Sequence, residues 1–237
     1  MISPSKILHG DSLELLQTLP DNHFDMLLTD PPYEISRPSN VQSMGRSGLD
    51  FGEWDKDFDQ YTWIKLALPK LKPGANLVIF NDWEKLGDIA RFLRKELGLS
   101  REKHAFRPLC SPVLWHKTNP NPLNCRTMPV QSVEMAVWTK IPGAKNTYNS
   151  NYHHGIFWQD HSIHRTAEHP TKKPDAVFEE LINLFTNSGD LILDPFLGGG
   201  TTAFAAEKTG RHFIGIEQDE THFNTAKEHW KRACSTV

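Results

Sequence analysis

The sequence predicts an α/β fold in which one sheet is flanked by helices. Short apolar runs alternate with amphipathic stretches of helical length along most of the 237 residues, which is the pattern of strands joined by crossover helices. A strand-like run at 191–193 leads through consecutive glycines into a helical stretch, and another at 24–29 ends in a proline-rich turn. Both turns are therefore expected at the carboxyl ends of strands, where open α/β sheets bind their ligands.

The predicted strands are short and largely apolar, as expected for strands covered on both faces of a sheet. They cover residues 6–9, 24–29, 76–81, 113–116, 133–138, 191–193 and 212–216. The predicted helices have apolar residues at helical spacing, and they cover residues 12–19, 61–71, 83–97, 174–186, 201–208 and 220–232. We expect Pro73-Gly74 and Gly98 to end the second and third helices, and Pro174 to begin the fourth.

The chain is expected to form one domain over residues 1–237, since this length suits a single α/β domain with elaborated loops. Two stretches, 34–60 and 141–168, lack regular periodicity, and loops of that length are usually functional or disordered. No run approaches the roughly 18 apolar residues that span a bilayer, and residues 1–11 lack the features of a signal peptide. We therefore expect a cytoplasmic protein with no membrane partner.

The tetrapeptide Asp30-Pro31-Pro32-Tyr33 follows the predicted strand 24–29 directly. The Asp30 carboxylate and the Pro31 carbonyl can each accept a hydrogen from an exocyclic amine. The two prolines fix the backbone and hold these acceptors in place, while the Tyr33 ring offers a face on which a base can stack. The set suits catalysis on a planar amine, although Asp and Pro are also common in turns without a function.

Residues 194–202 read Asp-Pro-Phe-Leu-Gly-Gly-Gly-Thr-Thr and connect a predicted strand to a predicted helix. Glycines let the backbone approach a ligand closely, and the free N–H groups at the start of the next helix lie beside it. A nucleotide-type binding turn is therefore predicted. The residues expected to contact its ligand are Asp194, Phe196, Gly198, Gly200 and Thr201.

Two cofactors are compatible with this turn. Gly198-x-Gly200-x-x-Ala203 fits the dinucleotide fingerprint, so an NAD-dependent oxidoreductase is one alternative. A carboxylate at the strand end would repel a pyrophosphate but attract the α-ammonium of S-adenosylmethionine, so Asp194 favours S-adenosylmethionine. Seventeen residues past Gly200, Glu217 ends another predicted strand, where its carboxylate can accept hydrogen bonds from ribose hydroxyls.

A third motif, His-Pro-Thr-Lys-Lys-Pro at residues 169–174, precedes a predicted helix. A lysine ammonium and the free N–H groups of a helix N-terminus both favour an anion. His169, Thr171 and Lys173 are therefore candidates for holding the carboxylate of the cofactor, although a basic turn before a helix is also an ordinary surface feature.

These three motifs, in this order, resemble those of amino-group DNA methyltransferases of the beta permutation group. The resemblance spans nearly the whole chain, and residues 50–56 are also similar to the small adenine methyltransferases of the MboII type. It implies a Rossmann-like S-adenosylmethionine-dependent methyltransferase fold with a circularly permuted motif order, built on a single mixed sheet flanked by helices. It also implies S-adenosylmethionine as the cofactor.

The permuted order places the predicted strand 6–9 beside the cofactor. The resemblance then implies that Asp11 contacts the adenine of S-adenosylmethionine, while its position equally fits an N-cap of helix 12–19. The chain departs from the family pattern at Gly199, where Ser is frequent, and at Lys172, where Gln is usual. Neither departure removes a group that the chemistry requires, so we expect effects on affinity more than on activity.

The implied reaction transfers a methyl group to N6 of adenine in double-stranded DNA by base flipping and direct in-line attack. Asp30 and the Pro31 carbonyl would accept the amine hydrogens, and Tyr33 would stack on the base. Neither Cys110 nor Cys125 follows a proline, so the Pro-Cys pair used for attack on cytosine C5 is absent. Adenine is favoured because N4-cytosine members of the family more often carry Ser at the first motif position. The alternatives are N4 of cytosine, an amine in RNA or protein, and a non-catalytic nucleic-acid-binding protein with a vestigial cofactor fold.

The charge distribution supports a nucleic-acid partner despite a net charge of −3. Residues 101–173 contain ten Lys and Arg against four Asp and Glu, a net of +6, which leaves −9 for the remainder. A basic segment on an acidic frame is typical of a nucleic-acid cleft, although a solvated loop region with an excess of basic residues would give the same count. We therefore expect DNA-recognition loops at 34–60 and 117–168. Candidate contacts are Lys117, Arg126, Lys140, Lys145 and Arg165.

The sequence also bears on protein partners, on the state of the cysteines and on metal binding. The resemblance is compatible with a homodimer and with a cognate restriction endonuclease. The three cysteines lack a Cys-x-x-Cys spacing and are expected to be reduced. No metal site is expected, because a histidine cluster in the basic segment lacks the cysteine or carboxylate spacing of a closed site; its members are His153, His154, His161 and His164.

Overall fold

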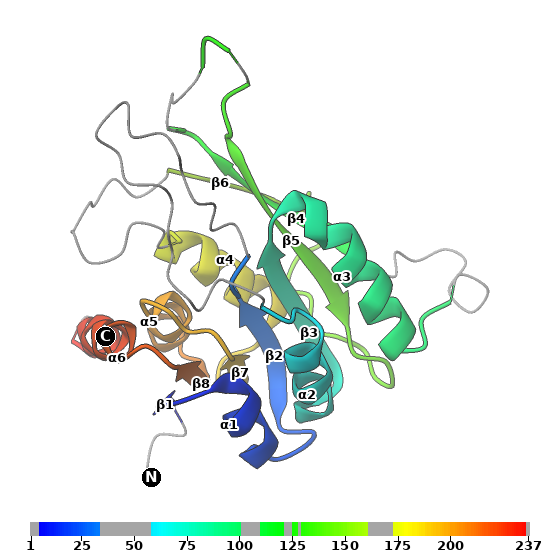
Figure 1. Ribbon diagram of the computed structural model, residues 1–237, viewed down its shortest axis with the longest axis vertical. Helices are drawn as coiled ribbons and strands as arrows, with labels where there is room; N and C mark the ends of the chain where they lie inside the picture. Colours follow the sequence, from blue (N-terminus) through cyan, green and yellow to red (C-terminus); the bar gives the residue numbers. More distant parts are fainter. Residues whose placement is uncertain are drawn as a thin grey trace.

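The structure is a computed structural model that describes residues 5–33, 58–100, 110–120, 125–127, 129–160 and 173–235. Within these ranges the chain forms one eight-stranded sheet with the order β1-β8-β7-β2-β3-β5-β4-β6 (Figure 1). The strands are β1 (Lys6–His9), β2 (Phe24–Thr29), β3 (Leu71–Asn81), β4 (Ser111–Lys117), β5 (Val133–Lys140), β6 (Ile156–Gln159), β7 (Leu191–Asp194) and β8 (His212–Glu217).

The sheet is mixed, as predicted. Strands β1, β8, β7, β2 and β3 are parallel neighbours, whereas β5 runs antiparallel to both β3 and β4. The last strand, β6, is parallel to β4. The β2 strand lies between β7 and β3, and five of its six residues are buried, which explains its nearly continuous apolar sequence.

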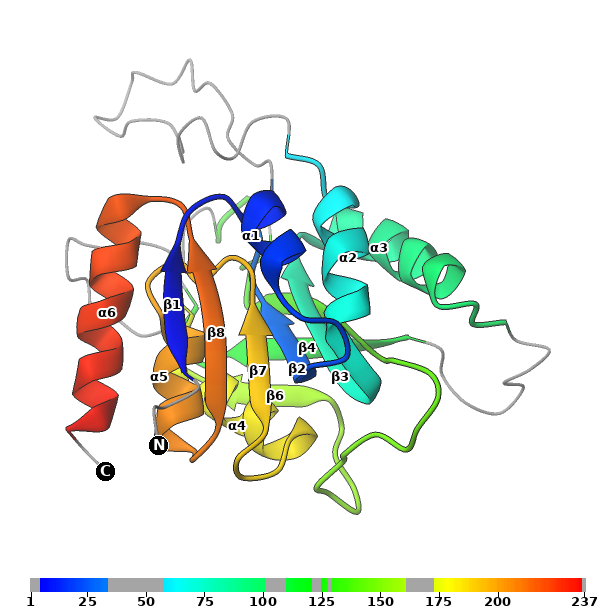
Figure 2. The same ribbon diagram turned by 90° about the horizontal axis from the view of Figure 1, so that it is seen from below.

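Helices cover both faces of the sheet (Figure 2). They are α1 (Ser12–Thr18), α2 (Thr62–Ala67), the 3-10 helix η3 (Leu68–Lys70), α3 (Trp83–Glu96), α4 (Asp175–Phe185), α5 (Thr201–Lys208) and α6 (Glu220–Cys234). One core cluster joins the sheet to α1, α2 and α3, and a second joins it to α4, α5 and α6. The arrangement is therefore a three-layer α/β structure. Within the described residues, no helix is both long and apolar enough to cross a bilayer.

One predicted helix differs from the structure. The stretch predicted as a helix at 61–71 is an α-helix only to Ala67, and a 3-10 turn containing Pro69 follows. Proline has no N–H to continue the α-helical ladder, which accounts for the change. Pro73-Gly74, expected to end that helix, instead lies inside β3, where the pairing register with β2 shifts and Gly74 adopts a φ of +86°.

The β6 strand was not predicted, because it lies in the stretch 141–168 that lacks an obvious period. Its four residues follow Gly155 and pair with β4, with Phe157 buried and Trp158 exposed. A strand of this length carries too few alternations to be recognised in the sequence. It is held by pairing with a distant strand.

Candidate active site

The sheet has a topological switch point between β7 and β2. After β7 the chain continues through α5 to β8 on one side, and after β2 it continues through α2 to β3 on the other. Connections that leave in opposite directions open a crevice at the carboxyl ends of the two strands. The residues that follow these strands are the glycine turn and the Asp30 turn, so the structure brings the two main predicted motifs to one place.

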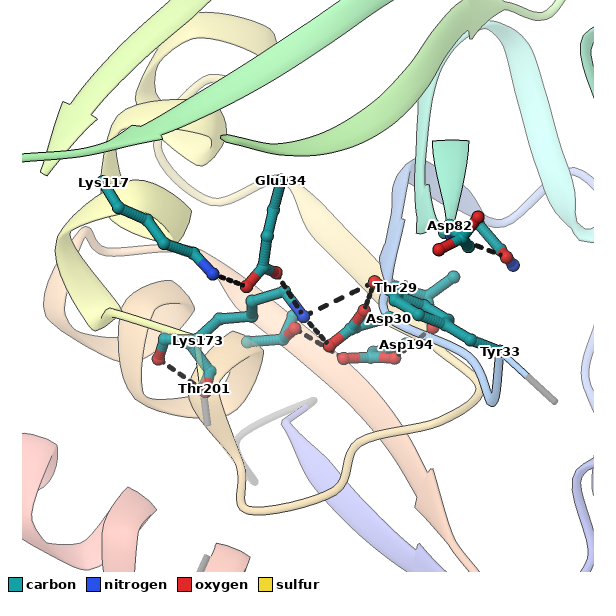
Figure 3. Close-up of polar contacts among 11 residues, drawn as sticks. Thr29, Asp30, Tyr33, Asp82, Lys117, Glu134, Lys173, Asp194 and Thr201 are labelled. Atoms are coloured by element: carbon teal, nitrogen blue, oxygen red, sulfur yellow. Dashed lines mark hydrogen bonds and ion pairs between the residues drawn. The ribbon is translucent and has the colours of Figure 1, made fainter. Parts of the chain in front are cut away.

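Asp30 is held by groups from two parts of the chain (Figure 3). Its Oδ1 accepts a hydrogen bond from the hydroxyl of Tyr33, and its Oδ2 lies 2.5 Å from the Nζ of Lys173. The Lys173 ammonium also lies 5.4 Å from the centre of the Tyr33 ring. Burial, followed by the negative charge of Asp30, raises the pKa of Tyr33 well above its usual range, so its hydroxyl stays protonated and remains a donor.

Lys173 also contacts a residue that the motif analysis did not identify. Its Nζ lies 3.0 Å from Oε2 of Glu134, whose Oε1 lies 2.7 Å from the Nζ of Lys117. Burial alone would raise the pKa of Glu134, but the two ammonium groups outweigh burial and lower it to about 2. Burial would likewise lower the pKa of Lys173, but the charge of Asp30, with those of Tyr33 and Glu134, keeps it well above its usual value. Both groups are therefore charged near neutral pH.

The prolines of the tetrapeptide lie between β2 and α2. Pro31 is buried, and the carbonyl of Pro32 accepts a hydrogen bond of 2.5 Å from Nε2 of Gln60. Gln60 is itself buried just before α2. This contact and the ion pair between Lys173 and Asp30 hold the turn by tertiary contacts as well as by proline geometry.

The carboxylate of Asp194, at the end of β7, accepts hydrogen bonds from neighbouring parts of the protein. Its Oδ1 accepts hydrogen bonds from Thr29 Oγ1 at 2.6 Å and from the Phe196 amide at 3.1 Å, and its Oδ2 accepts one from Thr202 Oγ1 at 2.5 Å. The side chain is 2% exposed, and burial raises its pKa to about 6 against the opposing effect of these bonds. Asp194 therefore joins β2, β7 and α5, and its contact with a cofactor ammonium stays a prediction.

The glycine turn has the backbone geometry that only glycine adopts readily. Gly198 and Gly200 have φ values of +53° and +84°, in the left-handed region. A Cβ on Gly200 would also lie 2.8 Å from the Cα of Ala226 in α6. The amide of Gly198 donates to Glu217 Oε2 at 2.7 Å, so the acid at the end of β8 faces the turn.

The other predicted cofactor residues have the following places. The Asp11 side chain accepts from the amides of Leu13 and Glu14 at the start of α1, so the N-cap alternative is observed. Thr201 Oγ1 donates to the Lys173 carbonyl at 3.5 Å, which links α5 to the third motif. The ring of Phe196 packs edge-on against Trp63. His169 and Thr171 lie outside the described residues, as do residues 34–57 and 161–168 of the predicted recognition loops.

Three residues of the site were not found by sequence reasoning. Glu134 had a detectable signal, because it is the one acid in the predicted strand 133–138, and acids are seldom buried without a partner. Gln60 had none. His229 in α6 contacts the carbonyl of Gly199 and the carboxylate of Asp175, each at 3.2 Å, and its position in an amphipathic helix gave no indication of this role.

In the described part of the chain, no group of three or more His, Cys, Asp and Glu could hold a metal ion.

The geometry at this edge fits S-adenosylmethionine. Asp11 and Glu217 follow or end parallel strands at the same edge of the sheet, and their carboxylates favour a cationic ligand there. The Glu217 carboxylate at the end of β8 is the group expected to accept hydrogen bonds from ribose hydroxyls, and that contact stays a prediction. The fold and the site together define an S-adenosylmethionine-dependent methyltransferase.

Comparison with known proteins gives the family. A family model described as DNA methylase matches residues 24–228. The Type II methyltransferase M2.LlaDCHI of Lactococcus lactis subsp. cremoris is 31% identical over 246 residues, which cover 94% of this chain and 87% of that protein. The crystal structure of the M1.HpyAVI–SAM complex is 30% identical, with a TM-score of 0.72 and coverage of 94% and 98%. The chain belongs to the DNA methylase family, which includes both adenine-N6 and cytosine-N4 enzymes.

The fold does not distinguish the two target bases. The PvuII DNA methyltransferase, which is cytosine-N4-specific, has a TM-score of 0.67 over 98% of this chain and 91% of its own, with 18% sequence identity. The resemblance to beta-group amino DNA methyltransferases and the use of S-adenosylmethionine are confirmed. The choice of base depends on the site.

Proposed function

We propose that this protein is a site-specific DNA methyltransferase that methylates N6 of adenine. The observation that supports this most is the position of Asp30, which follows β2 at the switch point beside the glycine turn and is oriented by Lys173 and Tyr33. The acid at the first motif position favours adenine, because N4-cytosine members of the family more often carry Ser there. N4 of cytosine is the alternative, since the Asp carboxylate can accept a hydrogen from either base.

The reaction requires the amine nitrogen to recover its lone pair from the ring. Asp30 and the Pro31 carbonyl accept the two amine hydrogens and localise that lone pair. Each carboxylate oxygen can accept two hydrogen bonds, so the Tyr33 hydroxyl and Lys173 leave acceptor capacity on both oxygens of Asp30. S-adenosylmethionine supplies an electrophilic methyl group on its sulfonium. Positioning and electrostatic stabilisation account for most of the acceleration.

The target base reaches this site by flipping out of the duplex, and Tyr33 provides the aromatic ring on which it stacks. In the structure the Tyr33 ring packs against the hydrophobic core, and the Lys173 ammonium lies over the ring. Pro32, held by Gln60, keeps the ring and the Pro31 carbonyl in a fixed relation. A preorganised set of this kind reduces the entropy cost of orienting the amine.

The cofactor is held by the strand ends on the other side of the crevice. Glu217 accepts from ribose hydroxyls, Asp11 approaches the adenine, and Gly198 and Gly200 admit the methionine part beside the backbone. The third motif contributes His169 and Thr171. Lys173 is assigned to the same motif by sequence, but its two ion pairs favour a role beside Asp30 over a contact with the cofactor carboxylate.

Double-stranded DNA is the proposed partner, with recognition by segments 34–60 and 117–168. Lys117 is removed from the set of phosphate contacts, because it is paired with Glu134 and its side chain is 14% exposed. Arg126, in contrast, is exposed. A homodimer, a cognate restriction endonuclease and a cytoplasmic location complete the proposal, as expected for a Type II modification enzyme.

The test is to incubate the protein with unmethylated DNA and methyl-labelled S-adenosylmethionine, and then to digest the DNA to nucleosides. We expect label in N6-methyladenine. Label in N4-methylcytosine would contradict the adenine assignment, and an unlabelled digest would contradict the proposed activity.

A further inference from the structure

Four charged side chains form a continuous chain that ends at Asp30, in the order Lys117, Glu134, Lys173 and Asp30 (Figure 3). The successive N–O distances are 2.7, 3.0 and 2.5 Å. We call these four residues the charge chain. The side chains of Lys117, Glu134 and Lys173 are 14%, 27% and 9% exposed, so solvent screens their interactions only in part.

The members of the charge chain are supplied by regular structure. Lys117 ends β4 and Glu134 is the second residue of β5, and the antiparallel register pairs Trp115 with Glu134. The Lys117 ammonium is also placed 5.2 Å from the centre of the Trp115 ring, and its backbone amide donates to Ser132 at 2.7 Å. The position of Glu134 is therefore set by two paired strands, as required of a group that positions another.

The charges of the chain balance, with two ammonium groups and two carboxylates. If Glu134 were neutral, Lys173 would face Asp30 alone and the local net charge would be +1. During methyl transfer the amine nitrogen acquires positive charge while one of its hydrogens is hydrogen-bonded to Asp30 and the other to the Pro31 carbonyl. An ammonium paired with Asp30 alone would neutralise that carboxylate, so Asp30 would stabilise the developing charge less, and the ammonium would also compete with the amine for the lone pairs of Asp30.

We propose that Glu134 is a positioning residue for the methyl-transfer reaction: it shares the Lys173 ammonium with Asp30, so that Asp30 is oriented without being neutralised. Lys117 holds the Glu134 carboxylate in the direction of Lys173. This inference rests on the proposed function, because it assigns Asp30 as the acceptor for the target amine. Glu134 acts through Lys173 and need not touch the base.

The experiment compares Glu134→Gln, Glu134→Asp and a matched control, Glu179→Gln. Glu179 lies in α4, is 23% exposed and pairs with Lys208 at 3.3 Å, so its replacement breaks a Glu–Lys pair outside the charge chain. For each variant we would measure the single-turnover rate of methyl transfer to duplex DNA, the affinity for S-adenosylmethionine by calorimetry, and the thermal midpoint.

We expect Glu134→Gln to reduce the methyl-transfer rate about tenfold to hundredfold, a range typical of groups that orient a functional ligand, with cofactor affinity within about twofold of wild type. Glu134→Asp keeps the negative charge, so its methyl-transfer rate should lie between those of Glu134→Gln and wild type. The rate of Glu179→Gln should match that of wild type. A Glu134→Gln rate within about twofold of the control contradicts the inference, as does a loss that is fully explained by weaker cofactor binding or by unfolding. Failure of the proposed function is distinct, since wild type itself would then give no N6-methyladenine.

Discussion

At the scale of single residues, the site depends on how Lys173 is shared between Asp30 and Glu134. The Lys173 side chain is 9% exposed, and removing one member of a buried ion pair leaves a buried charge without compensation. Lys173→Met would leave two carboxylates facing each other in a poorly solvated place. The stability of the protein and the orientation of Asp30 therefore depend on the same ammonium group.

We predict that Lys173→Met lowers the free energy of unfolding by about 3–5 kcal/mol, the range for breaking a buried pair. Urea denaturation at neutral pH measures this. Lys208→Met is the control, because the pair with Glu179 is more exposed and is expected to contribute no more than about 1 kcal/mol. Equal effects of the two substitutions would show that Lys173 is not acting as a buried counter-ion.

Because of Asp194, we expect the free energy of unfolding to depend on pH with a defined sign. Burial raises its folded-state pKa to about 6 from 3.8, so the folded protein binds the proton more tightly than the unfolded chain. The resulting stabilisation is fully present below about pH 4 and is lost as the pH rises through about 6, an effect of at most about 3 kcal/mol. Unfolding free energies of wild type and Asp194→Asn between pH 4 and pH 8 should therefore diverge in this window. Parallel curves would mean that Asp194 is not perturbed by burial.

At the scale of elements, the glycine turn depends on backbone geometry and on close packing. Gly200 combines a φ of +84° with the approach of Ala226 from α6, whereas Gly189 has a φ of +82° and nothing within 4 Å of an added Cβ. The two positions therefore separate the cost of the left-handed backbone from the cost of the contact.

We predict that Gly189→Ala destabilises the fold by about 1 kcal/mol, which reflects backbone conformation alone. Gly200→Ala should cost more, about 2–4 kcal/mol, and should weaken S-adenosylmethionine binding because α5 must shift away from α6. Denaturation and calorimetry check both quantities. Similar costs for the two variants, with unchanged cofactor affinity, would contradict the packing argument.

Several elements were predictable because their signals are local. The β2 run, its Pro-Pro turn and the glycine turn are contiguous in sequence, and the sheet order brings them together without further information. The β6 strand was missed because its four residues are ordered by pairing with β4. The contact between Glu134 and Lys173 joins residues from β5 and the start of α4, and a pair so distant in the chain leaves no periodic pattern.

At the scale of the whole molecule, the sheet places the proposed cofactor residues and the charged residues around Asp30 on opposite sides of the switch point between β7 and β2. The parallel strands β1, β8 and β7 supply the acids and the glycine turn, while β5 and β4 supply Glu134 and Lys117. Residues 101–173 carry a net charge of +6 within a chain of net charge −3. Attraction of DNA to this segment should therefore be largely electrostatic.

We predict that DNA affinity falls steeply with salt concentration and that Arg126→Ala reduces the slope of log K against log salt by about one, the value for one phosphate contact. Lys231→Ala is the control, since Lys231 lies in α6 and pairs with Glu228 outside the basic segment. Fluorescence anisotropy at several salt concentrations gives both slopes. An unchanged slope for Arg126→Ala would remove this residue from the DNA-binding surface.

The central claim is that Asp30, at the switch point, accepts the hydrogens of the target amine. The most direct test measures single-turnover methyl transfer and S-adenosylmethionine affinity on the same preparations of wild type and Asp30→Ala. We predict that Asp30→Ala lowers the rate of N6-methyladenine formation by at least about a thousandfold, a loss of about 4 kcal/mol of transition-state stabilisation, while cofactor affinity changes little. Methyl transfer within about tenfold of wild type would contradict the claim.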